Sequence, residues 1–203
     1  MDLLKVKRPL EENNFRSYFD FMTAARRYVG TVVGIPMQPP VAEKTREIPA
    51  GVVTFGVEYR TLDPESLERS YSTEEAHLAE LRATSPPGGF SDRGVSIHVR
   101  GTADGHEYLR FDVFDDNPHY HYAHPAAPGE PVVNNFVDFD AVALGDMLPW
   151  AIDRLRMRLA PMLTEAGGGH LVARLDHERI ASAIDEVQPL AERANLSAGG
   201  PER

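Results

Sequence analysis

The sequence predicts an α+β domain in which an antiparallel β-meander packs against amphipathic helices on one of its faces. Apolar and polar residues alternate over 95–99 and again over 109–113, as expected for half-buried strands. Between these two runs lies Asp104-Gly105, a turn sequence typical of β-hairpins. Apolar residues at helical spacing follow over 148–162 and predict a long helix with one apolar face. The apolar faces of the sheet and of this helix are therefore expected to pack against each other.

The chain before residue 95 contains fewer regular elements. Phe15, Phe19 and Met22 recur at helical spacing and predict an amphipathic helix over 10–29. The segment from Gly30 to Pro49 is rich in glycine and proline, which indicates an extended linker interrupted by a short strand at 31–33. The elements expected next, in chain order, are a strand over 53–59, a short helix over 73–84 and a loop over 85–91.

The chain after residue 113 completes the sheet and adds two helices. A third strand is expected to carry the histidines at 119–124, and a fourth to run from Val132 to Phe139. Asp146 is a suitable N-cap for the long helix, whereas Pro161 should bend it or break it near residue 157. The remaining expectations are a helix end at glycines 167–169, a strand over 170–175, a helix over 178–194 and a disordered tail over 195–203. We therefore expect a single α+β domain over 1–194.

The composition is that of a globular protein with an acidic balance. The 31 acidic residues outnumber the 21 basic ones, so the net charge of -10 would repel a nucleic-acid backbone. The chain has no cysteine, which excludes disulfides and suits a reducing compartment. The first residues become charged where a signal peptide needs an apolar stretch, and no apolar run approaches the roughly 20 residues that span a membrane. These features predict a cytoplasmic protein that acts neither on nucleic acid nor at a membrane.

The most informative segment is a cluster of three histidines, His119, His121 and His124, which follows the pair Asp115-Asp116. Imidazole is the commonest protein metal ligand and titrates near neutral pH. In a strand, alternate side chains share a face, so His119 and His121 lie together with Cα atoms about 7 Å apart. That spacing allows two imidazoles to bind one metal ion. His124 falls on the other face and joins them only if the chain turns.

A divalent metal is therefore the expected cofactor, with zinc, manganese and iron as the alternatives. Its predicted ligands are His119 and His121, completed by His124 or by an aspartate. Asp112 and Asp116 are candidates for that carboxylate or for a catalytic role. His98 alternates with apolar residues in the predicted sheet, so its side chain and that of Asp112 are expected to converge on the histidines. The spacing of the three histidines resembles the metallo-β-lactamase signature, with Ala123 in place of its aspartate, and we assign no family from it.

The function expected from these residues is a small enzyme of the hydrolase or lyase type that acts on a small molecule. A bound metal would acidify its water ligand to a pKa of about 7 and so produce a nucleophile. Without a metal, the same histidines could act as a general acid–base pair. The alternatives are a ligand-binding protein without catalysis, a homo-oligomer that pairs through its sheet edge or through the helix that carries Trp150, and a pH-responsive surface. The first two alternatives predict an exposed histidine strip with no pocket beside it, and the third predicts histidines at the surface.

Overall fold

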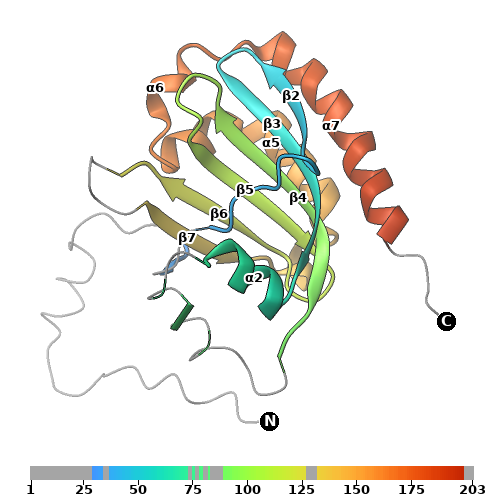
Figure 1. Cartoon of the computed structure of the whole chain (residues 1–203). Helices are drawn as coiled ribbons and strands as arrows, with labels where there is room; N and C mark the ends of the chain where they lie inside the picture. Colours follow the sequence, from blue (N-terminus) through green and yellow to red (C-terminus); the bar gives the residue numbers. More distant parts are fainter. Residues whose placement is uncertain are drawn as a thin grey trace, which may run out of the picture.

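A seven-stranded antiparallel sheet forms the centre of the protein (Figure 1). The computed structural model describes residues 29–33, 37–72, 75, 78–79, 82, 89–126 and 132–198 of the 203. The strands are β1 (Thr31–Val33), β2 (Arg46–Ala50), β3 (Val53–Leu62), β4 (Asp92–Gly101), β5 (Glu107–Phe114), β6 (His119–His124) and β7 (Val133–Asp138). The helices described in full are α2 (Pro64–Ser70), α4 (Ala141–Leu144), α5 (Met147–Glu165), α6 (Gly169–Val172) and α7 (His177–Ala198). The predicted α+β fold is confirmed.

The order of the strands is β1-β7-β6-β5-β4-β3-β2, so six consecutive strands form a meander and β1 is added beyond β7. This order places β6, the histidine strand, between β5 and β7 in the interior of the sheet. In a twisted antiparallel sheet, side chains from neighbouring strands at the same register form rows across each face. One such row contains Ser96, Asp112 and His119, and the next contains His98, Arg110 and His121.

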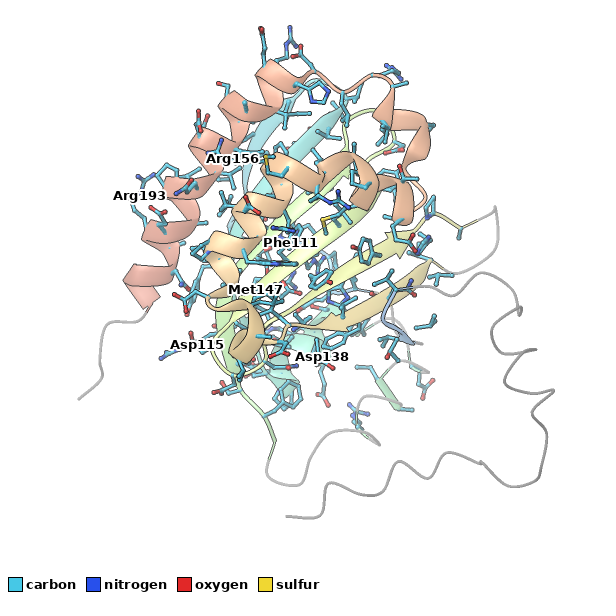
Figure 2. All side chains as sticks on the ribbon, turned by 180° about the vertical axis from the view of Figure 1, so that it is seen from behind. Phe111, Asp115, Asp138, Met147, Arg156 and Arg193 are labelled. Atoms are coloured by element: carbon cyan, nitrogen blue, oxygen red, sulfur yellow. The ribbon has the colours of Figure 1, made fainter. Side chains whose placement is uncertain are left out.

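Helices α5 and α7 cover one face of the sheet, as the view from behind shows (Figure 2). The alternating apolar residues of β3, β4 and β5 point to this side and are completely or almost completely buried. Phe111 of β5 and Met147 of α5 lie between the two layers. The left-handed Gly167 (φ +82°) follows the end of α5, a conformation that suits glycine because it has no Cβ.

The opposite face of the sheet is polar and is covered in part by α2 and by the segment at Met37-Gln38. Asp63 caps α2, because its carboxylate accepts a hydrogen bond from the backbone of Ser66. The Gln38 amide donates to the Ser66 carbonyl at 3.2 Å and to the Ser70 hydroxyl at 2.5 Å. These bonds hold the segment against the helix and so close part of the space above the polar side chains.

A β-bulge between β4 and β5 changes which residues reach this polar face. Val99 pairs with Leu109 but Arg100 pairs with Glu107, so Tyr108 is an extra residue in β5. Two residues of the bulged strand then oppose one on its partner, and the alternation shifts. As a result, Glu107 lies on the same face as Arg110, although the two are three residues apart in a strand.

Several boundaries differ from the sequence prediction. The segment from Gly30 to Pro49 was expected to be a linker, but its last residues form part of strand β2. Pro49 is compatible with this strand because β2 is at the edge of the sheet and is paired on one side only. The predicted strand over 170–175 is wrong, since residues Gly169–Val172 form α6. Helix α5 continues through Pro161 to Glu165 without the break expected near 157.

The last helix is longer than predicted, because α7 includes residues 195–198, which were assigned to the disordered tail. The helix expected over 10–29 lies outside the described residues, apart from its last position, Val29. The helix expected over 73–84 is described at four positions only, and all four are helical. Within the described part of the chain, no helix combines the length and apolar character needed to cross a membrane.

Candidate metal centre

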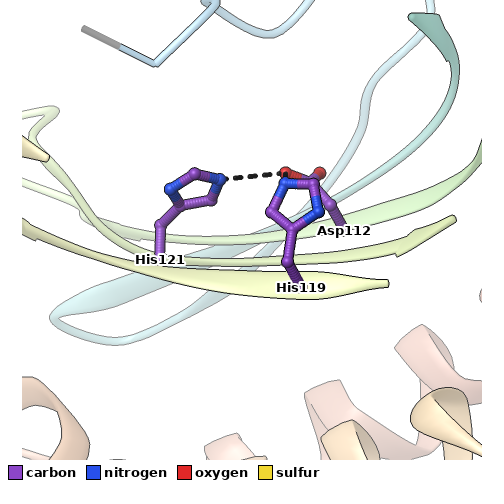
Figure 3. A group of neighbouring side chains, drawn as sticks. All are labelled: Asp112, His119 and His121. Atoms are coloured by element: carbon purple, nitrogen blue, oxygen red, sulfur yellow. Dashed lines mark ion pairs between the residues drawn. The ribbon is translucent and has the colours of Figure 1, made fainter. Parts of the chain in front are cut away.

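Three side chains converge on the polar face of the sheet: Asp112 from β5 and His119 and His121 from β6 (Figure 3). They project from the side of the strands that faces away from the helices. The Asp112 Oδ2 atom lies 3.3 Å from His119 Nε2 and 3.4 Å from His121 Nε2. All three side chains are buried, with residue exposures of 4%, 6% and 7% respectively. Strand pairing produces this proximity, because Asp112 is the direct register partner of His119.

Each imidazole is oriented by a hydrogen bond at its other nitrogen. His119 Nδ1 donates to the Asn117 carbonyl oxygen at 2.6 Å. His121 Nδ1 donates to the Asn134 side-chain oxygen at 2.8 Å. With Nδ1 occupied in this way, Nε2 is the atom of each ring that faces Asp112, and both Nε2 atoms point at the same carboxylate oxygen. A protonated ring donates to that oxygen, and a metal ion would take the place of the Nε2 proton. Histidines that bind metals have this arrangement, in which an acceptor beyond the ring sets its tautomer and orientation.

The Asp112 carboxylate is oriented in the same way. The Ser96 hydroxyl, its neighbour in the same row of the sheet, donates a hydrogen bond to Oδ1, while Oδ2 faces the histidines. The backbone at Asn117 is also held, because the Asp92 carboxylate accepts bonds from the amides of Asp116 and Asn117 at 3.1 and 2.9 Å. The ligand atoms are therefore preorganised by their neighbours in the sheet and in the loop before β6.

The spacing of the three atoms fits a single metal ion. Ligand atoms about 2.1 Å from one ion, at tetrahedral or octahedral angles, lie about 3.0–3.4 Å from one another. The two distances to Asp112 Oδ2 are 3.3 and 3.4 Å, and all three ligand atoms lie within 4.8 Å of one another. Two imidazoles and one carboxylate suit zinc, manganese or iron and leave coordination positions open for water or substrate.

The electrostatics of the cluster favour an ionised aspartate. Burial by itself raises the pKa of Asp112, but hydrogen bonds from His119 and His121 outweigh it and hold that pKa well below its usual range. Burial lowers the pKa of both histidines. For His119 the Asp112 carboxylate outweighs burial and the pKa is raised, whereas for His121 it does not and the pKa is lowered. The two rings thus differ in proton affinity, and both face the same ionised carboxylate.

Aromatic side chains pack against both histidine rings. The His119 ring stacks on Phe136 with a centroid separation of 4.4 Å, and Phe114 contacts the same ring edge-on at 5.6 Å. A cavity of about 240 Å³ lies above the cluster, and its lining includes Asp112, His119 and His121. A metal ion held there would therefore have its open positions inside a small, mostly apolar space.

A second group of buried charges lies beside the first. His98 Nδ1 and the Arg110 guanidinium both contact the Glu107 carboxylate, with three bonds of 2.7 Å. His98 Nε2 lies 3.5 Å from Glu58 Oε2. Burial lowers the pKa of His98, yet Glu107 outweighs this and the pKa is raised. The cavity lining includes Arg110 but neither His98 nor Glu107, so this group supports the site from the side.

Not every residue predicted for the site takes part in it. His124 lies on the opposite face of the sheet, where Asn135 Nδ2 approaches its Nε2 at 3.1 Å. The three histidines therefore do not form one ligand set, because β6 keeps its alternation through His124. Asp116 lies exposed in the loop before β6 and contributes a backbone amide rather than its carboxylate. His98 shares the polar face but contacts acids instead of the predicted metal ligands.

Three residues of the site region were not singled out from the sequence: Arg60, Asn134 and Glu107. Asn134 occupies an alternate position in the predicted strand from Val132 to Phe139, and this pattern could have placed it on the polar face. Arg60 lies one residue beyond the predicted strand over 53–59, and it belongs to β3 because the strand continues to Leu62. Glu107 gives no such signal, since strict alternation would place it on the other face of the sheet from Arg110. Only the bulge brings the two side chains to the same face.

Comparison with known proteins identifies a family but no activity. No curated protein and no solved structure matches the chain. The family described as "Domain of unknown function (DUF7700)" matches residues 47–191, which include most of β2, all elements from β3 to α6, most of α7 and all three residues of the candidate metal centre. Because this match extends over more than half of the 203 residues, the chain belongs to the DUF7700 family.

Proposed function

We propose that this protein is a divalent-metal-dependent enzyme of the hydrolase or lyase type that acts on a small molecule. One observation carries the proposal: two buried imidazole nitrogens and one carboxylate oxygen converge with the spacing of metal ligands at a cavity of about 240 Å³. Burying an aspartate and two histidines is costly unless each group is hydrogen-bonded or bound to a metal. Asp112, His119 and His121 are the ligands, and the cofactor is zinc, manganese or iron.

The chemistry follows from the number of protein ligands. Three ligands leave at least one coordination position for water or for an oxygen of the substrate. A metal in this position acidifies its water and polarises a carbonyl, which are the two requirements of hydrolysis and of many lyase reactions. The aromatic walls raise the strength of these interactions by lowering the local dielectric. The lack of cysteine and the net charge of -10 support a cytoplasmic enzyme without a nucleic-acid partner.

If the protein were a non-catalytic interaction protein, the histidines would be expected on an exposed edge strand. The interior position of β6 and the burial of His119 and His121 do not favour that alternative. Pairing of two copies through β1 or β2, which are the edge strands, stays a separate prediction.

Metal binding tests the proposal directly. The purified chain, stripped with a chelator and titrated with Zn²⁺ or Co²⁺, should bind about one equivalent. His121→Asn should lose most of the affinity, because it removes one of three protein ligands. His124→Asn is the matched control: the substitution is the same, the strand is the same and the residue is equally buried, but it lies on the other face. The proposal is wrong if the unsubstituted chain binds no metal, or if the two variants lose affinity equally.

A further inference from the structure

The lining of the cavity above the candidate metal centre also includes Arg60 from β3. Within the described part of the chain, the hydrogen bonds of its guanidinium all go to neutral oxygens of one residue. The Gln38 side-chain oxygen accepts at 2.6 Å and the Gln38 carbonyl at 3.3 and 3.4 Å. The Arg60 side chain is only 5% exposed, so this positive charge lies inside the protein without a close carboxylate acceptor.

The two arginines that line the cavity differ in how they are neutralised. Arg110 makes two hydrogen bonds of 2.7 Å to Glu107, which is the bidentate geometry of a complete ion pair. Arg60 lies 4.0 Å from Glu58, at the outer limit of an ion pair. The same Glu58 oxygen also accepts from the Val41 amide and the Thr45 hydroxyl, both at 3.3 Å. Arg60 therefore keeps the capacity to bind another anion.

The charge of the whole polar group also calls for an anion once a metal is bound. Three carboxylates (Asp112, Glu58 and Glu107) face two guanidinium groups, and His98 lies between two of these acids, so the positive and negative groups already come close to balancing without a metal. A divalent ion would therefore add positive charge that the protein's own acids do not fully offset. Local charge in such a site is dominated by the ion itself, and an anionic ligand would reduce the excess.

The strand register separates the guanidinium from the metal ligands. Arg60 lies two strands and two residues away from Asp112, so their Cα atoms are about 12 Å apart in a regular sheet. In β4, the register partner of Arg60 is Gly94, which has no side chain, and the partner of Asp112 is Ser96, whose small side chain is hydrogen-bonded to Asp112 itself. A molecule anchored on Arg60 can therefore extend toward the metal. The walls along this path are apolar and include Leu62, Leu67 and Phe114.

We propose that the cavity binds a small monocarboxylate with a compact apolar body, the carboxylate paired with Arg60 and the opposite end directed toward the metal. This inference rests on the proposed function, since it assigns a substrate class to the same site. The volume of about 240 Å³ is slightly below the roughly 300–1,000 Å³ of pockets for drug-sized ligands, so the ligand is small. A bidentate guanidinium–carboxylate pair gives both orientation and affinity in such a space.

Benzoate and its uncharged analogue benzamide are suitable probes, because they share a compact apolar ring and differ in the anionic group. Calorimetry on the Co²⁺-loaded full chain should show benzoate binding at least 10-fold tighter than benzamide. Arg60→Gln should weaken benzoate binding roughly 10- to 100-fold, as expected for the loss of charge-assisted hydrogen bonds. It should leave benzamide binding and Co²⁺ affinity within about twofold of the parent, which also verifies that the variant folds.

Two further variants complete the test. Arg60→Lys keeps the charge without the fork of donors and should recover part of the benzoate affinity. Arg93→Gln is the control, since Arg93 is an exposed arginine of β4 outside the cavity lining, and it should change nothing. If the chain binds Co²⁺ but benzoate binds no tighter than benzamide, or binds Arg60→Gln as well as the parent, the carboxylate inference is overturned and the metal centre stands. If the parent binds no Co²⁺, the proposed function and this inference fall together.

Discussion

The buried ion pair between Glu107 and Arg110 provides the sharpest test of the packing beneath the site. Glu107 receives three hydrogen bonds of 2.7 Å, two from Arg110 and one from His98. The substitution Glu107→Gln keeps the shape of the side chain but removes its charge. It also turns one acceptor oxygen into an amide nitrogen that faces a guanidinium or imidazole donor. Arg110 then loses its only carboxylate hydrogen-bond partner within the described part of the chain, and His98 keeps only the Glu58 oxygen at 3.5 Å.

The expected loss can be worked out from this geometry. The side chains of Glu107 and Arg110 are 12% and 4% exposed, so water can replace little of what is lost. Removing one partner of a buried ion pair costs about 3–5 kcal/mol. A domain of this size is typically stable by roughly 5–15 kcal/mol, so the variant should still fold but with a much lower denaturation midpoint. Urea unfolding at pH 7, followed by circular dichroism, measures the difference.

A matched control separates burial from ion pairing in general. Glu65→Gln removes the same charge from Glu65–Arg69, a pair at 2.6 Å with exposures of 81% and 65%. Pairs of this exposed kind contribute about 0–1 kcal/mol. A loss for Glu107→Gln within 1 kcal/mol of that for Glu65→Gln would refute the reasoning, because burial would then make no difference.

The same variant also has a predicted pH dependence. Burial raises the pKa of Glu107, but Arg110 and His98 outweigh it and the pKa is held well below its ordinary 4.5. A group with a lowered pKa stabilises the fold fully above its ordinary pKa, and this contribution disappears as the pH falls through the folded-state value. The difference between the parent and Glu107→Gln should therefore be largest between about pH 5 and pH 6.5 and shrink below pH 4. It should also shrink above pH 6.5, because Glu107 stabilises the charged form of His98 and that charge is lost as the pH rises.

Two further outcomes are expected. The pKa of His98 is raised above its ordinary 6.5 although burial opposes this, so the ionic contribution of His98 to stability is complete below about pH 6.5 and is lost as the pH rises through the raised value. The stability difference between the parent and His98→Asn, measured by urea unfolding, should therefore shrink between pH 6 and pH 8.5. A difference that grows over this range would contradict the raised pKa. Gly94→Ala should lower the free energy of unfolding by about 3 kcal/mol or more, because the new Cβ would overlap the Val113 carbonyl oxygen and lie 2.8 Å from the Cα of Phe114. Gly169→Ala is the control, since its Cβ would meet nothing within 4 Å, and it should change the melting temperature very little. Equal effects of the two substitutions would contradict the close approach of β4 and β5.

Much of the candidate site followed from local alternation along the strands. Because successive side chains in a strand point to opposite faces, the sequence alone placed His119 and His121 together and His124 on the other side. The same argument placed Asp112 on the polar face of the neighbouring strand. The Asp104-Gly105 turn then predicted that the strand of Asp112 pairs with the strand that carries His98. Each of these conclusions depends on residues close to one another along the chain.

The tertiary structure decided what alternation cannot express. Burial of the histidines depends on β7 and β1 continuing the sheet beyond β6, and the cavity depends on α2 and Gln38 covering the polar face. The bulge at Tyr108 brings Glu107 beside Arg110, and the pairing of β3 with β4 brings Arg60 into the same space. A strand pattern states which way a side chain points, because that is a property of the local backbone. Which distant residues meet it depends on strand order, register and packing, and these are set only when the whole chain folds.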